Sequence, residues 1–130
     1  MVNSSEYSLA LIEDELPIVH LYKSKFEHEG FLVKVAYNAR DGYRLLKEAP
    51  PDLLLLDLRM PGMQGDELLA RVRAEDWGAD IRVIILTNLS RDEAPSSLRF
   101  LGVDRYVVKA HHTPSQVVAI AREVLGLPRG

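Results

Sequence analysis

Residues 50–62 read PPDLLLLDLRMPG, and this stretch decides the fold of the chain. Its four consecutive leucines predict a short β-strand that is buried on both faces, because a strand inside a parallel sheet is apolar at every position. The strand ends in the carboxylate Asp57, and a loop with a Pro61-Gly62 turn follows. Since burying a carboxylate costs free energy unless a neighbour compensates its charge, the stretch predicts a functional role for Asp57.

Short apolar runs of the same kind recur along the chain and alternate with amphipathic segments. The apolar runs are residues 8–12, 31–36, 52–56, 82–86 and 106–108. Helical patterns lie at residues 17–29, 38–49, 66–75, 90–101 and 113–126. This alternation indicates parallel strands joined by right-handed crossovers. We therefore expect an α/β fold of the flavodoxin-like, doubly wound (βα)5 type. Such folds have a five-stranded parallel sheet in the order 2-1-3-4-5 with helices on both faces.

Capping signals mark several of the expected helix ends. Asn38 precedes the second helix as a capping residue. Ser90 and Glu93 fit a capping box that opens the fourth helix, which we expect to extend to about residue 101. Thr113 and Gln116 fit a second box at the start of the last helix.

Composition bounds the class of protein. The chain has 130 residues, the size of one ordinary domain, and 47% of them are hydrophobic, which is enough for a full core. The net charge of −3 offers no basic surface to nucleic acid, and the lack of cysteine excludes disulfides and cysteine metal sites. The N-terminus lacks the pattern of a signal peptide, and no apolar run approaches the roughly 18 residues of a membrane span. We expect a cytoplasmic protein with no direct contact to nucleic acid and none to a membrane. We also expect a disordered or extended leader at residues 1–7, one domain at residues 8–126 and a tail at residues 127–130.

Polar side chains follow the apolar runs at the ends where parallel sheets bind ligands. The first run ends in Glu13-Asp14, the third in Asp57, the fourth in Thr87 and the fifth in Lys109. Because the first and third strands are neighbours in the expected order, three carboxylates meet there and repel one another. A divalent cation relieves this repulsion, and Mg²⁺ prefers such hard oxygen ligands. With Lys109 and Thr87 as partners of an anion, the set suits transfer of a phosphoryl group to a carboxylate.

Each of these residues also has an ordinary structural interpretation. Asp14 could cap the first helix, Thr87 could be a β-branched residue at a strand end, and Lys109 could be solvated. Asp57 is harder to explain in this way because it interrupts the most apolar run. The functional interpretation therefore depends on the joint pattern.

The sequence resembles a response-regulator receiver domain of two-component signalling, similar to the single-domain chemotaxis regulators. The matching motifs are LIED at residues 11–14, DLLLLDLRMPGMQG at 52–65, VIILT at 83–87 and GVDRYVVK at 102–109. They follow the order and spacing of the family over essentially the whole chain. The long middle motif is the most specific of them.

The resemblance implies a phosphorylation-dependent switch rather than an enzyme. Asp57 would take a phosphoryl group from the phosphohistidine of a histidine kinase or phosphotransfer protein. Mg²⁺ or Mn²⁺ would bind to Asp14, to Asp57, to the backbone carbonyl of Arg59 and, through water, to Glu13.

The resemblance also assigns roles on the other side of the site. Thr87 would hydrogen-bond the phosphoryl group, Lys109 would pair with it, and Tyr106 would be the switch aromatic. Tyr106 could instead be a strand residue that packs on a neighbouring helix. The fourth helix, fifth strand and fifth helix would contact a downstream protein target, and the domain would be a monomer or weak dimer.

Three residues depart from the family pattern. Ala110 follows Lys109 where the family has a proline in a cis peptide. A cis bond before another residue costs about 2.5–4 kcal/mol, so we expect a trans peptide, or a strained cis peptide if the phosphoryl site demands it. Asn88 replaces a small residue and could crowd the phosphoryl site. Arg59 is basic and could contact the phosphate or shield it from water. The neighbouring His111-His112 pair is expected in an exposed loop rather than at a metal.

Other classes of function remain open at this point. A degenerate receiver would act as a protein-interaction module without phosphorylation. A phosphatase of the aspartyl-nucleophile type would need a second acid where Arg59 stands. A flavodoxin would need a phosphate-binding loop rich in hydroxyl groups and glycine after the first strand, and none is present.

Overall fold

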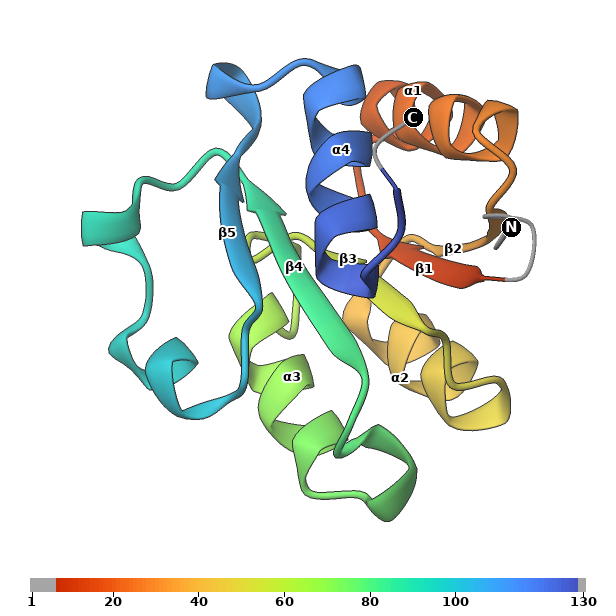
Figure 1. The fold of residues 1–130 in the computed structure, drawn as a ribbon. Helices are drawn as coiled ribbons and strands as arrows, with labels where there is room; N and C mark the ends of the chain where they lie inside the picture. Colours follow the sequence, from red (N-terminus) through yellow and green to blue (C-terminus); the bar gives the residue numbers. More distant parts are fainter. Residues whose placement is uncertain (1–6, 129–130) are drawn as a thin grey trace.

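The structure is a computed structural model that describes residues 7–128 (Figure 1). Most of the expected leader and the end of the expected tail, residues 1–6 and 129–130, lie outside the described residues. The domain boundaries at residues 8 and 126 therefore stay a prediction. Among the described residues, no helix combines the length and apolar character that crossing a membrane requires.

A parallel sheet of five strands forms the centre of the molecule. The strands are β1 (Ser8–Ile12), β2 (Leu32–Ala36), β3 (Leu53–Leu56), β4 (Arg82–Thr87) and β5 (Arg105–Val108). Their order is β2-β1-β3-β4-β5, and every neighbouring pair is parallel. This order confirms the predicted fold class. β2, which carries the exposed Lys34, lies at one edge.

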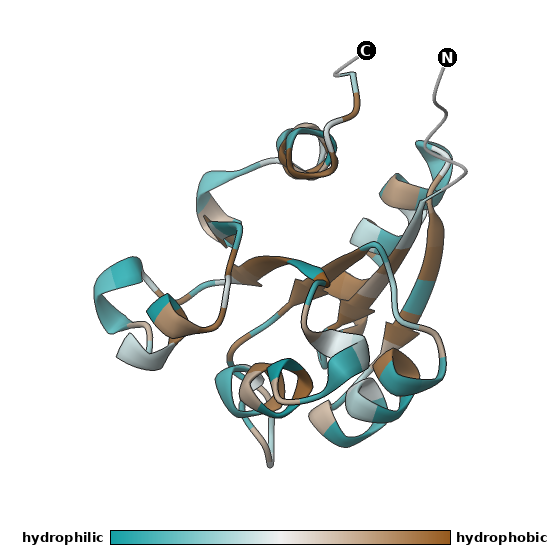
Figure 2. Ribbon diagram, turned by 60° about the horizontal axis from the view of Figure 1, so that its bottom comes forward, coloured by the Kyte–Doolittle hydropathy of each residue, from teal (hydrophilic) through white to brown (hydrophobic). Residues whose placement is uncertain are grey.

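Helices cover both faces of the sheet. Figure 1 shows α1 (Leu16–His28) and α4 (Pro114–Leu125) on one face, and α2 (Ala39–Glu48) and α3 (Gly65–Arg73) on the other. In Figure 2 the apolar strands lie between helices whose outer surfaces are hydrophilic. The predicted caps are present at α2 and α4. The Asn38 side chain accepts a hydrogen bond from the backbone of Asp41 at 2.7 Å, and Thr113 forms its capping box with Gln116.

The four leucines of β3 divide between two apolar cores. Leu53 and Leu55 pack with residues of α1 and α4, whereas Leu54 and Leu56 pack with residues of α2 and α3. All four are fully buried. Burying one leucine side chain contributes about 1.5–3 kcal/mol. β3 is therefore packed on both faces and paired with a strand on each side, and this packing fixes the position of Asp57, which follows it.

The prediction of a helix at residues 90–101 is wrong. The chain instead forms two short 3-10 segments, η3 (Arg91–Glu93) and η4 (Ser96–Phe100). The break lies at Ala94, whose backbone is extended (φ −68°, ψ 147°), directly before Pro95. Proline has no N–H for a helical hydrogen bond and disfavours helical geometry in the preceding residue. We call residues 91–100 the 3-10 segment; it lies beside β5 in Figure 1.

Arg73 anchors one end of the 3-10 segment to the rest of the fold. From the last turn of α3, its guanidinium donates to the backbone carbonyls of Leu101 at 2.7 Å and Gly102 at 2.9 Å. It also donates to the carbonyls of Gly78 at 2.9 Å and Ala79 at 3.1 Å. Burial lowers the pKa of Arg73. One side chain thus joins the turn before β4 to the turn before β5.

Candidate functional site

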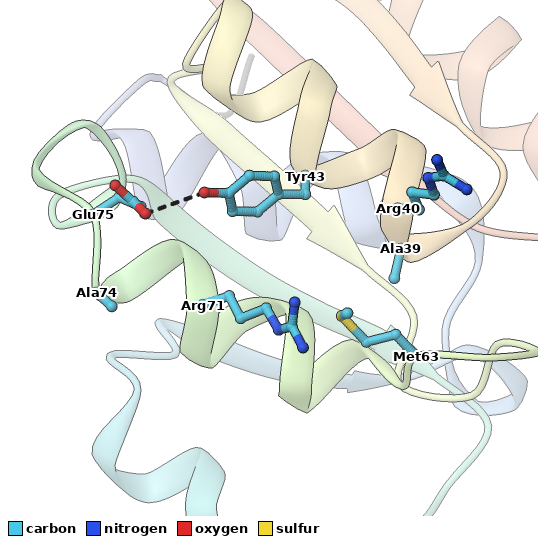
Figure 3. Close-up of a pocket in the computed structure, with 7 residues that line it drawn as sticks. All are labelled: Ala39, Arg40, Tyr43, Met63, Arg71, Ala74 and Glu75. Atoms are coloured by element: carbon cyan, nitrogen blue, oxygen red, sulfur yellow. Dashed lines mark hydrogen bonds between the residues drawn. The ribbon is translucent and has the colours of Figure 1, made fainter.

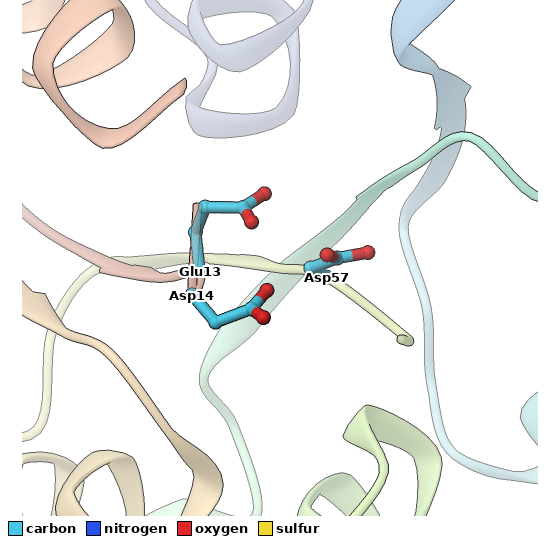
Figure 4. A group of neighbouring side chains, drawn as sticks. All are labelled: Glu13, Asp14 and Asp57. Carbon is cyan, nitrogen blue, oxygen red and sulfur yellow. The ribbon is translucent and has the colours of Figure 1, made fainter. Parts of the chain in front are cut away.

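Three carboxylates meet at the carboxyl end of the two central strands. Glu13 and Asp14 follow β1, and Asp57 follows β3, its neighbour in the sheet. Ligand oxygens of the three side chains lie within 4.8 Å of one another (Figure 4). Glu13 and Asp57 are 1% and 5% exposed. The structure therefore brings together all three of the acids predicted from the sequence.

Lys109 reaches this cluster from the end of β5. Its ammonium forms an ion pair with Glu13 and lies 3.5 Å from Oδ2 of Asp57. The lysine side chain is only 8% exposed. Lys109 is thus a buried cation shared by acids from two different strands.

The charges of the cluster do not balance. Burial raises the pKa of the Glu13 carboxyl above its ordinary value, although the hydrogen bond from Lys109 opposes this. Burial alone would lower the pKa of Lys109, but the hydrogen bond to Glu13 and the charge of Asp57 raise it. The cluster holds three carboxylates and one buried ammonium, which pairs with only two of them, so the residues present fit a hard cation with oxygen ligands.

Backbone groups hold the acids in place. The N–H of Arg59 donates to Oδ1 of Asp57 at 3.3 Å, and the N–H of Glu15 donates to Oε2 of Glu13 at 3.0 Å. Asp57 also donates its own N–H to the carbonyl of Ile12 at 3.1 Å, which continues the pairing of β3 with β1. These bonds fix the buried side chains of Glu13 and Asp57 at the carboxyl end of β1 and β3.

Gly65 permits the close approach of α3 to Asp57. A Cβ at this position would lie 2.2 Å from the carbonyl oxygen of Asp57 and 2.9 Å from Cα of Leu58. The backbone N–H of Gly65 donates to the carbonyl of Leu58 at 2.9 Å. The sequence reasoning missed this role. The only signal in the sequence is a glycine at the start of a predicted helix, and the sequence does not show its contact with the preceding loop.

Thr87 completes the site from the end of β4. Its side chain is buried, and its hydroxyl oxygen accepts from the backbone N–H of Leu89 at 3.4 Å. A cavity of about 290 Å³ lies beside it, lined by Glu15, Asp57, Arg59, Thr87, Asn88, Leu89, Glu93 and Lys109. The acceptor candidate, the hydroxyl and the ammonium therefore share one small cavity.

Tyr106 does not line that cavity. Its hydroxyl donates to the backbone carbonyls of Leu89 at 2.8 Å and Ser90 at 3.3 Å, in the loop that follows Thr87. The guanidinium of Arg91 lies over the Tyr106 ring at 5.9 Å. Tyr106 thus packs against a loop and a 3-10 turn, and not against the α-helix expected there.

The two histidines match the predicted exposed loop only in part. His111 is exposed but ends a short 3-10 turn, η5 (Lys109–His111), and His112 is half-buried in the loop before Thr113, with Nδ1 3.0 Å from the carbonyl of Val108. Within residues 7–128, the group of side chains that could hold a metal is Glu13, Asp14 and Asp57, and neither histidine belongs to it.

A larger cavity of about 730 Å³ lies between α2 and α3. Figure 3 shows its lining residues, which are Ala39, Arg40, Tyr43, Met63, Arg71, Ala74 and Glu75. It contains a hydrogen bond of 3.1 Å from the Tyr43 hydroxyl to Glu75, and no residue of the acidic cluster lines it. Size alone therefore does not identify the site.

Comparison with known proteins agrees with this geometry. Residues 9–122 match the family described as "Response regulator receiver domain". The phosphate regulon transcriptional regulatory protein PhoB of Rhizobium meliloti is 35% identical over 114 residues, which are 86% of this chain and 49% of that protein. An uncharacterised 14.6 kDa protein of Leptolyngbya boryana is 32% identical over 109 residues, 84% of this chain and 83% of that protein.

Solved structures show the same fold. The CheY-like response regulator receiver domain protein of Methanospirillum hungatei superposes with a TM-score of 0.83 at 26% identity. The match covers 92% of this chain and 94% of that one. The chain spans about half the length of the PhoB proteins that it matches. On the family match and the shared architecture, the chain belongs to the response regulator receiver domains of two-component systems.

Proposed function

We propose that this receiver domain is a switch that accepts a phosphoryl group on Asp57. The donor is the phosphohistidine of a histidine kinase or a phosphotransfer protein. The observation that carries the proposal is the convergence of three groups from different strands. The carboxylate of Asp57 lies 3.5 Å from the Lys109 ammonium, and both line one cavity with Thr87.

The transfer step is a displacement at phosphorus. A carboxylate oxygen of Asp57 forms the new P–O bond, the bond from phosphorus to the donor's imidazole nitrogen breaks, and its electron pair stays on that nitrogen. Lys109 supplies a fixed positive charge beside the transferring oxygens, and Thr87 supplies a hydroxyl donor. Hydrolysis reverses the state, because attack of water on phosphorus releases inorganic phosphate and restores the carboxylate. The chain needs no enzymatic activity beyond this self-catalysed chemistry.

We propose Mg²⁺ or Mn²⁺ as the cofactor. Asp14, Asp57 and the backbone carbonyl of Arg59 would hold the ion, with Glu13 acting through water. When bound, the ion neutralises negative charge on the transferring oxygens. The excess of carboxylates over ammonium in the cluster supports this assignment.

In this proposal, a partner protein recognises the phosphorylated state at the face formed by the 3-10 segment, β5 and α4. Thr87 and Tyr106 connect the site to this face through the loop at Leu89. Phe100 is 80% exposed there, and Arg99 and Arg105 are also exposed. The partner is a downstream protein. We also propose that the protein is cytoplasmic and is a monomer or a weak dimer.

Incubation with acetyl phosphate and Mg²⁺, followed by intact-mass measurement, tests the proposal. The wild type should gain the mass of one phosphoryl group, and Asp57→Asn or addition of a chelator should abolish the gain. Beryllofluoride with Mg²⁺ should bind to the wild type and not to Asp57→Asn. If the wild type shows no phosphorylated species, the chain is a degenerate receiver that acts only as an interaction module. A gain that persists in Asp57→Asn would refute the assignment of Asp57.

A further inference from the structure

Two departures from the family pattern meet in one hydrogen bond. The side-chain oxygen Oδ1 of Asn88 accepts from the backbone N–H of Ala110 at 3.1 Å. Asn88 directly follows Thr87, and Ala110 directly follows Lys109. The bond therefore joins the residue after the site's hydroxyl to the residue after the site's ammonium.

Each partner supplies something that the usual residue lacks. A proline at position 110 would have no N–H to donate, and an alanine or glycine at position 88 would have no side-chain oxygen to accept. The Lys109–Ala110 peptide is trans, as predicted, so the Ala110 N–H is available on an ordinary backbone. The two departures are thus chemically complementary.

The bond continues the pairing of β4 with β5. Thr87 and Val108 form the last paired positions of the two strands, and the Asn88 contact lies just beyond them. On its other side, the carbonyl of Lys109 accepts from the backbone N–H of His112 at 3.3 Å. The peptide group between Lys109 and Ala110 therefore makes two hydrogen bonds, one through its carbonyl and one through its N–H, and Asn88 accepts the second.

We propose that Asn88 is a positioning residue for phosphoryl acceptance and acts through the Ala110 N–H. By fixing the peptide after Lys109, it holds the backbone from which the ammonium reaches Glu13 and Asp57. This role rests on the proposed function of Asp57. Asn88 itself is exposed, so its contribution is that of a single hydrogen bond at the surface.

A double-mutant cycle of Asn88→Ala and Ala110→Pro tests this role. The readout is the rate of Asp57 phosphorylation by acetyl phosphate at saturating Mg²⁺. Loss of one exposed hydrogen bond corresponds to about a 2- to 10-fold slower rate, and we expect this in Asn88→Ala. In the Ala110→Pro background, where no N–H exists, Asn88→Ala should have no further effect. Equal effects in both backgrounds would refute the proposal, because Asn88 would then act by another route, such as crowding.

Amide hydrogen exchange at Ala110 gives a second readout. Exchange should speed up in Asn88→Ala, while exchange at Val108, inside β5, should not change. Asn38→Ala is the matched control, because it removes a similar side-chain acceptor from the cap of α2 at a residue that belongs neither to the acidic cluster nor to the lining of the cavity beside Thr87. It should lower thermal stability and leave the rate unchanged.

The outcomes separate the two proposals. A wild type that takes no phosphoryl group overturns the proposed function and the role of Asn88 with it. If the wild type and Asn88→Ala are phosphorylated at the same rate, only the role of Asn88 is overturned. Unchanged Ala110 exchange in a folded Asn88→Ala variant also overturns it.

Discussion

The two sides of the site are built differently. One side, which we call the acidic half, consists of Glu13, Asp14 and Asp57 at the ends of the central strands β1 and β3. The other, the outer half, consists of Thr87, Asn88 and Lys109 at the ends of β4 and β5, together with Tyr106 inside β5. β3 has a strand on each side and a helix-covered core on each face, whereas β5 lies at an edge beside a 3-10 segment. Asp57 thus follows a strand that is packed on all sides, whereas its partners lie at a sheet edge and in loops, and the two halves should respond differently to mutation.

The largest effect should come from breaking the ion pair that joins the two halves. Lys109→Met leaves Glu13 and Asp57 buried without their cation. Removing one partner of a buried ion pair costs about 3–5 kcal/mol, so we expect the free energy of unfolding in urea, without divalent ions, to fall by about 3 kcal/mol. Phosphorylation should slow by about 10²-fold or more.

Arg105→Met is the control for this variant. Arg105 pairs with Glu123 at 3.0 Å, but both side chains are substantially exposed. Exposed pairs contribute about 0–1 kcal/mol, so the unfolding free energy should change little. Equal losses in the two variants would mean that the Lys109 pair is not a special link between the halves.

The next largest effect should come from a glycine substitution beside the acidic half, compared with a similar substitution elsewhere in the fold. Gly65→Ala and Gly78→Ala each place a Cβ about 2 Å from a backbone carbonyl oxygen, of Asp57 and Val72 respectively. Overpacking of this kind costs about 1–3 kcal/mol, and chemical denaturation should show a loss of that size in both. Only Gly65→Ala should also slow phosphorylation, because only its clash displaces the Asp57 backbone. If Gly78→Ala slowed it as much, general destabilisation would be the cause.

A smaller effect should arise beside the outer half, in the 3-10 segment, on Pro95→Ala. Proline interrupts a stretch that otherwise begins with a capping box, and alanine is the strongest helix former. Far-ultraviolet circular dichroism should show a gain of helix. The unfolding free energy should change by no more than about 1 kcal/mol, and Asp57 should be phosphorylated at the wild-type rate. An unchanged spectrum would mean that Pro95 is not what breaks the helix.

The smallest effect concerns the capping box of η3. Hydrogen bonds from the Ser90 hydroxyl and backbone N–H lower the pKa of Glu93. The folded state therefore binds this proton less tightly than the unfolded chain, so the box stabilises the fold above the ordinary pKa of 4.5. This contribution is lost as the pH falls through the lowered value. In Ser90→Ala the pKa should rise, and an NMR titration of the Glu93 carboxyl carbon measures it; an unshifted curve would contradict the role of Ser90.

The acidic half was predictable from the sequence because its determinants are local. A run of leucines predicts a buried strand, parallel strands end at a common edge, and Glu13, Asp14 and Asp57 are the residues at those ends. The rule needs only the positions of the strand ends and the strand order of the fold class. The capping boxes at Ser90 and Thr113 were predictable for the same reason, since both partners lie within one turn.

The outer half was predicted less well because its contacts join residues that are distant in sequence. The bond between Asn88 and Ala110 spans 22 positions and depends on how two loops leave the sheet. The same holds for Arg73, outside this half: its sequence position predicts an ordinary basic residue in a last helical turn, yet it donates to four carbonyls, two of them 28 and 29 positions away. Pro95 was a visible signal, and it outweighed the capping box that precedes it.

The edge strands affect how copies of this domain can associate with one another. Lys34 lies exposed in the middle of β2, and Arg105 lies exposed at the start of the short β5. An open edge offers unpaired backbone groups to a strand from another molecule, and a charged side chain there opposes such pairing. Growth of the sheet from copy to copy, which is the first step toward fibrous aggregates, is therefore disfavoured at both edges. Contacts between copies of this domain should form through its helices and loops.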